Sequence, residues 1–225
     1  MSRLPPMPKE EGVLLVNEFF YSIQGESTQA GRPCFFVRLT GCHLRCGYCD
    51  TAYAFFEGTR FGVDEVLAEV RAAGCRLVQI TGGEPLLQPA VYALMDRLLA
   101  ADHEVMVETS GSLDASRVPS GVRRIFDVKT PESGEAAANR WENFKPEALR
   151  EGDEVKFVIA SRRDYEWARD VVRQRFSETT VPLLFSPVWE TLHGRDLASW
   201  VLADALPVRV QVQLHKVMWG EKRGV

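Results

Sequence analysis

Three cysteines lie within eight residues in the segment Gly41-Cys42-His43-Leu44-Arg45-Cys46-Gly47-Tyr48-Cys49-Asp50-Thr51. The segment directly follows an apolar run at residues 35–39, which is typical of a buried strand. Because three and then two residues separate the cysteines, one tight loop can bring all three thiolates to a single centre. Electron-transfer iron–sulfur clusters normally use four thiolates. The loop therefore predicts a metal centre that lacks one protein ligand.

A missing ligand leaves a position open at the metal, and chemistry at a metal requires such a position. The other two cysteines of the chain, Cys34 and Cys75, are the candidates for a fourth ligand. We expect both to lie at strand starts, away from the loop, as small core hydrophobes. A structural zinc site is a weaker alternative, because His43 is too close to Cys42 in sequence to complete the same tetrahedron easily. A reactive dithiol is weaker still, since a third cysteine adds nothing to it.

Strands and helices alternate along the rest of the chain. Apolar runs predict strands at residues 35–39, 77–81, 105–107, 124–128, 155–159 and 181–185. Amphipathic stripes predict helices at about residues 63–73, 90–99, 163–176 and 196–205, with Gly74 closing the first and Pro89 opening the second. Residues 208–214 alternate apolar and polar side chains, which predicts a last strand at a sheet edge.

This order predicts an α/β protein with a mostly parallel sheet, which places ligands at the carboxyl ends of its strands. A closed eight-unit barrel typically needs about 250 residues. The sequence shows only about six or seven units, several with short or missing helices. We therefore predict an incomplete, splayed barrel, a partial TIM barrel of the (β/α)6 type. No repeat or linker divides the chain, so we expect residues 1–225 to form one domain.

The composition limits the class of function. The chain has 225 residues, with 27 Lys and Arg against 31 Asp and Glu, and 45% hydrophobic residues, which argues against disordered, collagen-like and coiled-coil proteins. The net charge of −4 disfavours nucleic acid as a partner. No stretch reaches the roughly 20 apolar residues that span a membrane, and residues 1–11 lack the apolar centre of a secretory signal. Clustered cysteines suit a reducing compartment, so we expect a cytoplasmic protein that acts on a small molecule.

A second motif, Thr81-Gly82-Gly83-Glu84-Pro85, follows the strand predicted at residues 77–81. Glycines let a backbone approach a ligand closely, although a Gly-Gly pair alone usually marks only a turn. Polar residues also follow the next two strands, at 108–111 and 127–131. All these groups should meet the cysteines at one rim of the sheet. Arg38 lies within an apolar strand, where a guanidinium needs an anionic partner from either the protein or a substrate.

The cysteine segment, with the aromatic Tyr48 before its last cysteine, resembles the cluster motif of the radical S-adenosylmethionine (SAM) superfamily. The resemblance implies a [4Fe-4S] cluster on Cys42, Cys46 and Cys49, with SAM bound at the iron that has no cysteine. One electron would then split SAM into methionine and a 5′-deoxyadenosyl radical. Tyr48 would lie beside the adenine; otherwise it is a core aromatic.

The segment at residues 81–85 resembles the Gly-Gly-Glu-Pro motif of the same superfamily. This likeness implies that Gly83 and Glu84 hold the methionine amine. The other cofactor contacts that we expect are Cys49, Asp50, Ser110 and Lys129. Surface Ser and Lys residues are usually only solvated, which is the alternative for the last two.

Further stretches, at residues 22–26, 36–39, 49–51, 108–111 and 213–220, resemble the 7-carboxy-7-deazaguanine synthase family, and the likeness is weakest at residues 132–150. That family implies conversion of 6-carboxy-5,6,7,8-tetrahydropterin to 7-carboxy-7-deazaguanine with loss of ammonia, in the biosynthesis of queuosine and other 7-deazapurines. The adenosyl radical would take hydrogen from C6, the ring would contract, and SAM would be re-formed. The protein must supply the geometry, while the cofactor supplies the chemistry.

Residue by residue, the same resemblance implies substrate contacts from Ile23, Gln24, Gly25, Arg38 and Thr81, with Arg38 at the substrate carboxylate. Thr51 matches a position that ligates Mg²⁺ through its hydroxyl, with helix capping as the alternative. Ser186, Pro187, Val188 and Trp189 would face the adenosine. His215 and Lys216 are either a surface pair or close to the substrate. A homodimer and an electron donor such as flavodoxin or ferredoxin are also expected.

Two other functions compete with this interpretation. An activase that installs a radical in another protein is also a short, incomplete barrel, but Arg38 and the Gln24-Gly25-Glu26 segment suit a small carboxylated ligand better. A non-catalytic iron–sulfur carrier is the second alternative. Its cluster would not respond to SAM.

Overall fold

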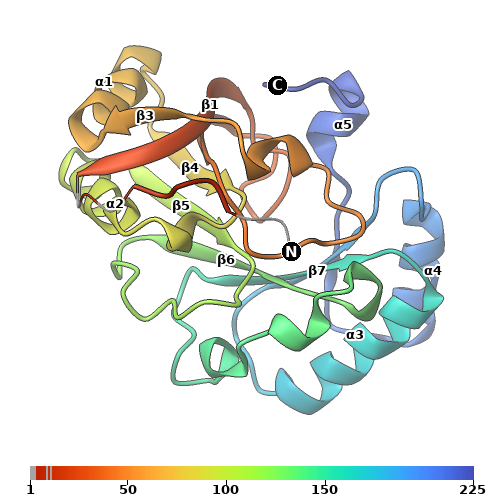
Figure 1. Cartoon of the computed structure of the whole chain (residues 1–225). Coiled ribbons are helices and arrows are strands. Elements are labelled where there is room, and N and C mark those ends of the chain that lie inside the picture. Colours follow the sequence, from red (N-terminus) through yellow and green to blue (C-terminus); the bar gives the residue numbers. More distant parts are fainter. Residues whose placement is uncertain (1–3, 9, 11) are drawn as a thin grey trace.

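The computed structural model describes residues 4–8, 10 and 12–225. The described residues form nine strands in one sheet, in the order β3-β1-β2-β4-β5-β6-β7-β8-β9 (Figure 1). The strands are β1 (Val13–Ile23), β2 (Pro33–Leu39), β3 (Thr59–Gly62), β4 (Leu77–Gly82), β5 (Glu104–Thr109), β6 (Arg123–Val128), β7 (Glu154–Ile159), β8 (Leu183–Pro187) and β9 (Arg209–Val210). The helices are α1 (Val63–Ala73), α2 (Ala90–Ala100), α3 (Arg162–Arg175), α4 (Gly194–Ala203) and α5 (Leu214–Trp219).

The sheet is parallel from β2 through β4 to β9, while β1 pairs antiparallel with β2 and β3. In the described part of the chain β3 and β9 each have one neighbour, so the barrel stays open. Figure 1 shows α1 and α2 beside one end of the sheet and α3 and α4 beside the other. No α-helix lies in the described connections from β5 to β6 and from β6 to β7. The predicted incomplete, splayed α/β barrel is confirmed.

The predicted helices form for the expected reasons. In α1 the residues Val63, Val66, Leu67 and Val70 are buried against the core, and Gly74 ends the helix in the left-handed conformation at φ 65°. Helix α2 begins directly after Pro89, which needs no backbone donor there. The parallel strands β4 and β5, which follow α1 and α2, are almost continuously buried, as both faces of such a sheet are covered.

Two strands were not predicted, β1 and β3. In β1 the residues Leu14, Leu15 and Val16 are buried in succession, whereas Tyr21 near its end is 58% exposed. This pattern is neither a continuous apolar run nor a regular alternation. Antiparallel pairing with β2, rather than local sequence, makes these residues a strand.

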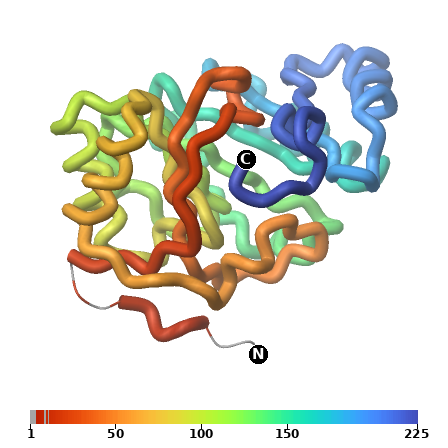
Figure 2. The backbone as a smooth tube through the Cα atoms, turned by 90° about the horizontal axis from the view of Figure 1, so that it is seen from above, coloured from red at the N-terminus to blue at the C-terminus, as the bar shows by residue number. Residues whose placement is uncertain are grey.

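The strand predicted at residues 208–214 is wrong for most of its length. Only Arg209 and Val210 pair with β8, at the edge of the sheet. The backbone N–H of Leu214 instead donates to the carbonyl of Gly25 at 2.9 Å, and α5 begins there. Figure 2 shows that the chain then turns back from α5 toward β1. A Cβ at Gly224 would lie 4.0 Å from that of Phe20, so the end of the chain lies against β1.

Among the described residues, no helix is both long and apolar enough to cross a membrane. The prediction that residues 1–11 are not a secretory signal concerns a segment that lies partly outside the described residues, which omit 1–3, 9 and 11.

Candidate active site

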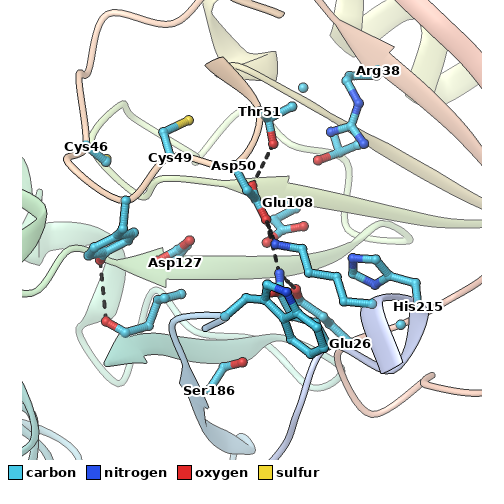
Figure 3. Close-up of a pocket in the computed structure, with 18 of the residues that line it drawn as sticks. Glu26, Arg38, Cys46, Cys49, Asp50, Thr51, Glu108, Asp127, Ser186 and His215 are labelled. Carbon is cyan, nitrogen blue, oxygen red and sulfur yellow. Dashed lines mark hydrogen bonds and ion pairs between the residues drawn. The ribbon is translucent and has the colours of Figure 1, made fainter. Parts of the chain in front are cut away.

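A cavity of about 730 Å³ opens at the carboxyl ends of the parallel strands. Its lining includes residues from the cysteine loop, from the ends of β4 to β8, from β1 and β2, and from the C-terminal segment. Figure 3 shows Cys46 and Cys49 on one side of this cavity and Glu26 and His215 on the other, with Glu108 between them. The position matches the rule that parallel α/β sheets bind ligands at their carboxyl edge.

The cysteine loop is held in place by its backbone. The N–H of Gly47 donates to the carbonyl of Ser133 at 2.9 Å, and the N–H of Arg45 donates to the Glu135 carboxylate at 2.6 Å. Cys42 is buried and Cys46 and Cys49 are half-buried, and all three line the cavity. The loop therefore presents its three thiols from one fixed segment.

Cys34 and Cys75 lie away from the loop, as expected. Both are buried, and the Cys75 thiol lies 3.5 Å from the carbonyl of Pro33, at the amino end of β2. Burial raises the pKa of Cys34 to about 12, which is the state of an inert core thiol. Neither cysteine lines the cavity, so the loop offers three thiolates and no fourth.

The three thiols suit a cluster that is itself large. Among the described residues no three His, Cys, Asp or Glu side chains lie close enough to hold one metal ion. A [4Fe-4S] cubane binds each thiolate at a different iron, so its ligands lie around a wider group. Burial raises the pKa of all three thiols, that of Cys46 to about 11, while the nearby Lys129 ammonium opposes the rise. Cluster binding must therefore displace the thiol protons.

The Gly-Gly-Glu-Pro segment packs directly against the cysteine loop. The N–H of Glu84 donates to the carbonyl of Gly41 at 2.8 Å, and Gly83 and Thr81 line the cavity. A Cβ on Gly83 would lie 2.1 Å from that same carbonyl oxygen. Glycine at this position is therefore required for the two motifs to touch.

Replacing Gly83 with alanine is expected to separate these two segments, because the atom in the way belongs to the backbone and cannot rotate aside. We expect the free energy of unfolding to fall by about 2 kcal/mol and less iron to be retained after reconstitution. Gly12→Ala is the matched control, since a Cβ there would meet nothing within 4 Å. A Gly83→Ala variant with unchanged melting temperature and iron content would contradict this packing argument.

The Glu84 side chain lies behind the wall of the cavity and does not line it. It is completely buried. Its carboxylate accepts hydrogen bonds from the N–H of Leu86 at 3.0 Å, the hydroxyl of Thr109 at 2.8 Å, and the N–H and hydroxyl of Ser110 at 2.8 and 2.5 Å. In this structure Glu84 ties the end of β4 to the end of β5, and its contact with the methionine amine stays a prediction.

Lys129 and Asp127 form a buried ion pair beside the cysteines. Their Nζ and Oδ2 atoms are 3.0 Å apart. Burial works to lower the pKa of Lys129, but Asp127 together with the nearby Cys46 and Tyr48 raises it. Two buried polar atoms of the cavity lining have no partner among the described residues: Oδ1 of Asp127 and Nε1 of Trp189. Such groups are costly unless a ligand or water pairs with them. Ser110, Ser186, Pro187, Val188 and Tyr48 line the same region.

Arg38 forms an ion pair with a protein carboxylate, and it also lines the cavity. Its Nε donates to Glu18 at 2.7 Å, and its guanidinium lies 5.4 Å from the ring centre of Phe20 and 5.8 Å from that of Tyr53. A guanidinium carries five N–H donors. The bond to Glu18 uses one of them and fixes the group, so others can meet a ligand in the cavity that Arg38 lines.

The segment at residues 23–25, which consists of Ile23, Gln24 and Gly25, forms another part of the lining. Gln24 is buried and donates to the side chain of Gln79. A Cβ on Gly25 would lie 2.0 Å from Nδ1 of His215, so this glycine admits the C-terminal segment. Burial lowers the pKa of His215, which is therefore neutral near pH 7.

Thr51 does not cap a helix. It precedes the 3-10 helix Ala52–Phe55, but its side chain makes no capping bond and instead donates to Oδ1 of Asp50 at 2.8 Å. Asp50 also accepts from Nζ of Lys216 at 2.8 Å and from Gln213 at 3.2 Å. The interpretation of His215 and Lys216 as a surface pair is wrong, since both line the cavity and Lys216 ties α5 to the cysteine loop.

Sequence reasoning missed a buried charged group composed of Glu26, Glu108, Asp127 and Lys156. The signal was present, because Lys156 interrupts an apolar strand just as Arg38 does. The bond from Gln213 to Glu26, at 2.8 Å, joins residues 187 positions apart and left no local signal.

Residues 36–130 match the family model of the Radical SAM superfamily. Together with the three-cysteine loop at the carboxyl rim of an open barrel, this match defines a radical SAM enzyme. The 7-carboxy-7-deazaguanine synthase of Koribacter versatilis is 45% identical to this chain, over 93% of this chain and 99% of the relative. That of Chlorobaculum tepidum is 44% identical, over 96% and 99%. The chain belongs to the 7-carboxy-7-deazaguanine synthase family.

A solved structure shares the fold. The crystal structure of QueE from Escherichia coli matches with a TM-score of 0.71, covering 90% of this chain and 95% of that chain at 23% identity. At this identity the match supports the open-barrel architecture and does not assign individual residues.

Proposed function

We propose that the protein converts 6-carboxy-5,6,7,8-tetrahydropterin to 7-carboxy-7-deazaguanine with loss of ammonia, in 7-deazapurine biosynthesis. The observation that carries this proposal is that one cavity holds both halves of the required site. Three thiols lie on one side, and Arg38 with the residue 23–25 segment supplies groups for a small carboxylated ligand. A cavity of about 730 Å³ is large enough for a small substrate beside a cofactor.

Cys42, Cys46 and Cys49 would hold the [4Fe-4S] cluster. With SAM bound, the cluster would supply the electron that splits SAM into methionine and a 5′-deoxyadenosyl radical. Gly83 brings its backbone to the cofactor side of the cavity, and Tyr48, Asp50, Ser110 and Lys129 line that side with polar groups. The unpaired Nε1 of Trp189 and Oδ1 of Asp127 offer one donor and one acceptor for cofactor polar groups. Glu84 would support this wall through Ser110.

On the substrate side, Arg38 would pair with the substrate carboxylate, for which its planar fork is suited. Ile23, Gln24, Gly25 and Thr81 would contact the pterin. Thr51 would ligate Mg²⁺ through its hydroxyl after giving up its bond to Asp50, with substrate oxygens and water completing the shell.

Several further features belong to the same proposal. Residues 1–225 would act as one domain, since every described strand joins one sheet. A reductant must supply the electron, and flavodoxin or ferredoxin would serve. A cytoplasmic location is expected, because the free cysteines suit a reducing compartment. A homodimer is expected as well.

The test is an anaerobic product assay. Reconstituted protein, SAM, dithionite, Mg²⁺ and carboxytetrahydropterin are incubated together, and the products are identified by mass spectrometry. We expect 7-carboxy-7-deazaguanine and ammonia in equal amounts. Cleavage of SAM without any deazaguanine would contradict the proposal and favour the activase, whose substrate would be another protein.

A further inference from the structure

A buried group of charges lies in the cavity between the cysteine loop and the C-terminal segment. We call Glu26, Glu108, Asp127 and Lys156 the Lys156 cluster. The Lys156 side chain is 5% exposed. Its Nζ lies 2.7 Å from Oε2 of Glu26, contacts Oε1 of Glu108, and lies 3.8 Å from Oδ2 of Asp127. All four residues line the cavity.

Lys156 is the cation that Glu26 and Glu108 share. Asp127 has its own partner in Lys129, at 3.0 Å. Burial works to lower the pKa of Lys156, but the surrounding carboxylates raise it well above its ordinary value, so it stays charged. Burial works to raise the pKa of Glu26, yet Lys156 holds it below the ordinary value. Burial and the negative charges of Glu26 and Asp127 raise the pKa of Glu108 in spite of Lys156.

Side-chain amides on two sides of the cluster donate hydrogen bonds toward its carboxylates. Nε2 of Gln24 donates to Gln79, and Nε2 of Gln79 donates to Oε2 of Glu108 at 3.0 Å. On the other side Gln213 donates to Oε1 of Glu26 at 2.8 Å. The requirement to donate to Glu108 therefore sets the orientation of both Gln79 and Gln24.

The carboxylate oxygens of Glu26 and Glu108 can accept further hydrogen bonds from a ligand in the cavity. An ionised carboxylate has about four lone-pair positions. The Glu108 side chain accepts hydrogen bonds from Lys156 and Gln79, and the Glu26 side chain accepts them from Lys156 and Gln213. The two side chains are 23% and 16% exposed. What they present to the cavity is suited to a ligand edge rich in N–H donors, such as the amide N–H and amino group of an aminopyrimidinone ring.

We propose that Lys156 is a positioning residue, which holds the carboxylates of Glu26 and Glu108 side by side as acceptors for the N–H edge of a pterin. This inference rests on the proposed function. Without the ammonium, two buried carboxylates would face one another, and one of them would take up a proton and become a donor. The acceptor pair would then be lost, although Lys156 itself performs no chemistry.

The experiment measures binding separately from turnover. The probe is 6-carboxypterin, a stable oxidised relative of the substrate, titrated into reconstituted protein with SAM present and followed by its fluorescence. We expect Lys156→Met to weaken its binding by at least about 30-fold. The matched control Lys145→Met, at an exposed lysine outside the cavity, should leave binding unchanged. Lys156→Arg keeps the charge and should restore part of the affinity.

In turnover, Lys156→Met should raise KM for the substrate by a similar factor and change kcat less. If Lys156→Met does not fold, the double variant Glu26→Gln/Lys156→Met removes one excess negative charge and is compared with Glu26→Gln alone, with the same expected loss between the two. Unchanged 6-carboxypterin binding in the variant measured, or no binding by the wild type, would overturn the inference.

These outcomes separate the two proposals. If the wild-type protein makes 7-carboxy-7-deazaguanine and the Lys156 variant binds 6-carboxypterin as tightly as the wild type does, the proposed function is retained and the role of Lys156 is rejected. Binding that depends on Lys156, with no deazaguanine product, supports the role of Lys156 and rejects the proposed function.

Discussion

Replacing Cys46 with alanine is expected to abolish product formation and SAM cleavage together. Cys46 is one of three thiols on the loop, and no fourth cysteine lines the cavity to replace it. Loss of a neighbour that only orients a metal ligand typically costs about 10- to 100-fold in affinity or activity, so loss of a ligand should cost more. The variant should still fold, because Cys46 is half-buried on a loop and lies outside the core. Iron content, low-temperature electron paramagnetic resonance and SAM cleavage are the measurements.

Cys75→Ala is the matched control for this result. Cys75 is buried at the far end of the sheet, so its removal should leave iron content and activity intact and lower only the stability slightly. A Cys46→Ala variant that keeps a full cluster and turns over substrate would show that the loop is not the iron site.

Replacing Arg38 with alanine is expected to remove nearly all turnover while leaving SAM cleavage measurable. Truncating one partner of a buried charge pair costs about 3 kcal/mol, or roughly 150-fold in kcat/KM. Here the lost partner is the guanidinium that would face the substrate carboxylate. The variant should fold, because Glu18 keeps a hydrogen bond from the Tyr53 hydroxyl at 2.9 Å. Product formation and 5′-deoxyadenosine formation are measured in the same samples.

Arg60→Ala provides the control, since Arg60 lies on β3 in an exposed ion pair with Glu10 and does not line the cavity. Exposed pairs contribute at most about 1 kcal/mol, so its activity should match wild type. Full product formation by Arg38→Ala would show that Arg38 serves only Glu18, and simultaneous loss of SAM cleavage would show that it supports the cofactor side instead.

The parallel half of the fold could be predicted because its signals are local. Strands β4 to β7 are short apolar runs bounded by turns, and Gly74 and Pro89 mark helix ends by their own backbone preferences. Strand β1 could not be predicted in this way, since its pairing with β2 decides its structure. Residues 208–214 show the opposite error, because their alternation favours a strand while the contact of Leu214 with Gly25 starts a helix.

In the candidate site, too, the features with local sequence signals could be predicted and those set by long-range contacts could not. The cysteine loop and Gly83 were visible as motifs, and the structure brings both to one rim, with the Glu84 N–H on the carbonyl of Gly41. Which way a motif side chain points was not visible, and Glu84 faces Thr109 and Ser110 behind the cavity wall. Long-range pairs such as Lys216 with Asp50 depend on where the C-terminal helix packs. That packing is a property of the whole fold.

The most direct measurement records the electron paramagnetic resonance spectrum of the reduced, anaerobically reconstituted wild-type protein with and without SAM. Three cysteine ligands leave one iron of a cubane free, so the spectrum should be that of a [4Fe-4S]⁺ cluster and should change when SAM is added. Protein that carries zinc in place of iron, or a cluster whose spectrum is the same with and without SAM, would contradict the account.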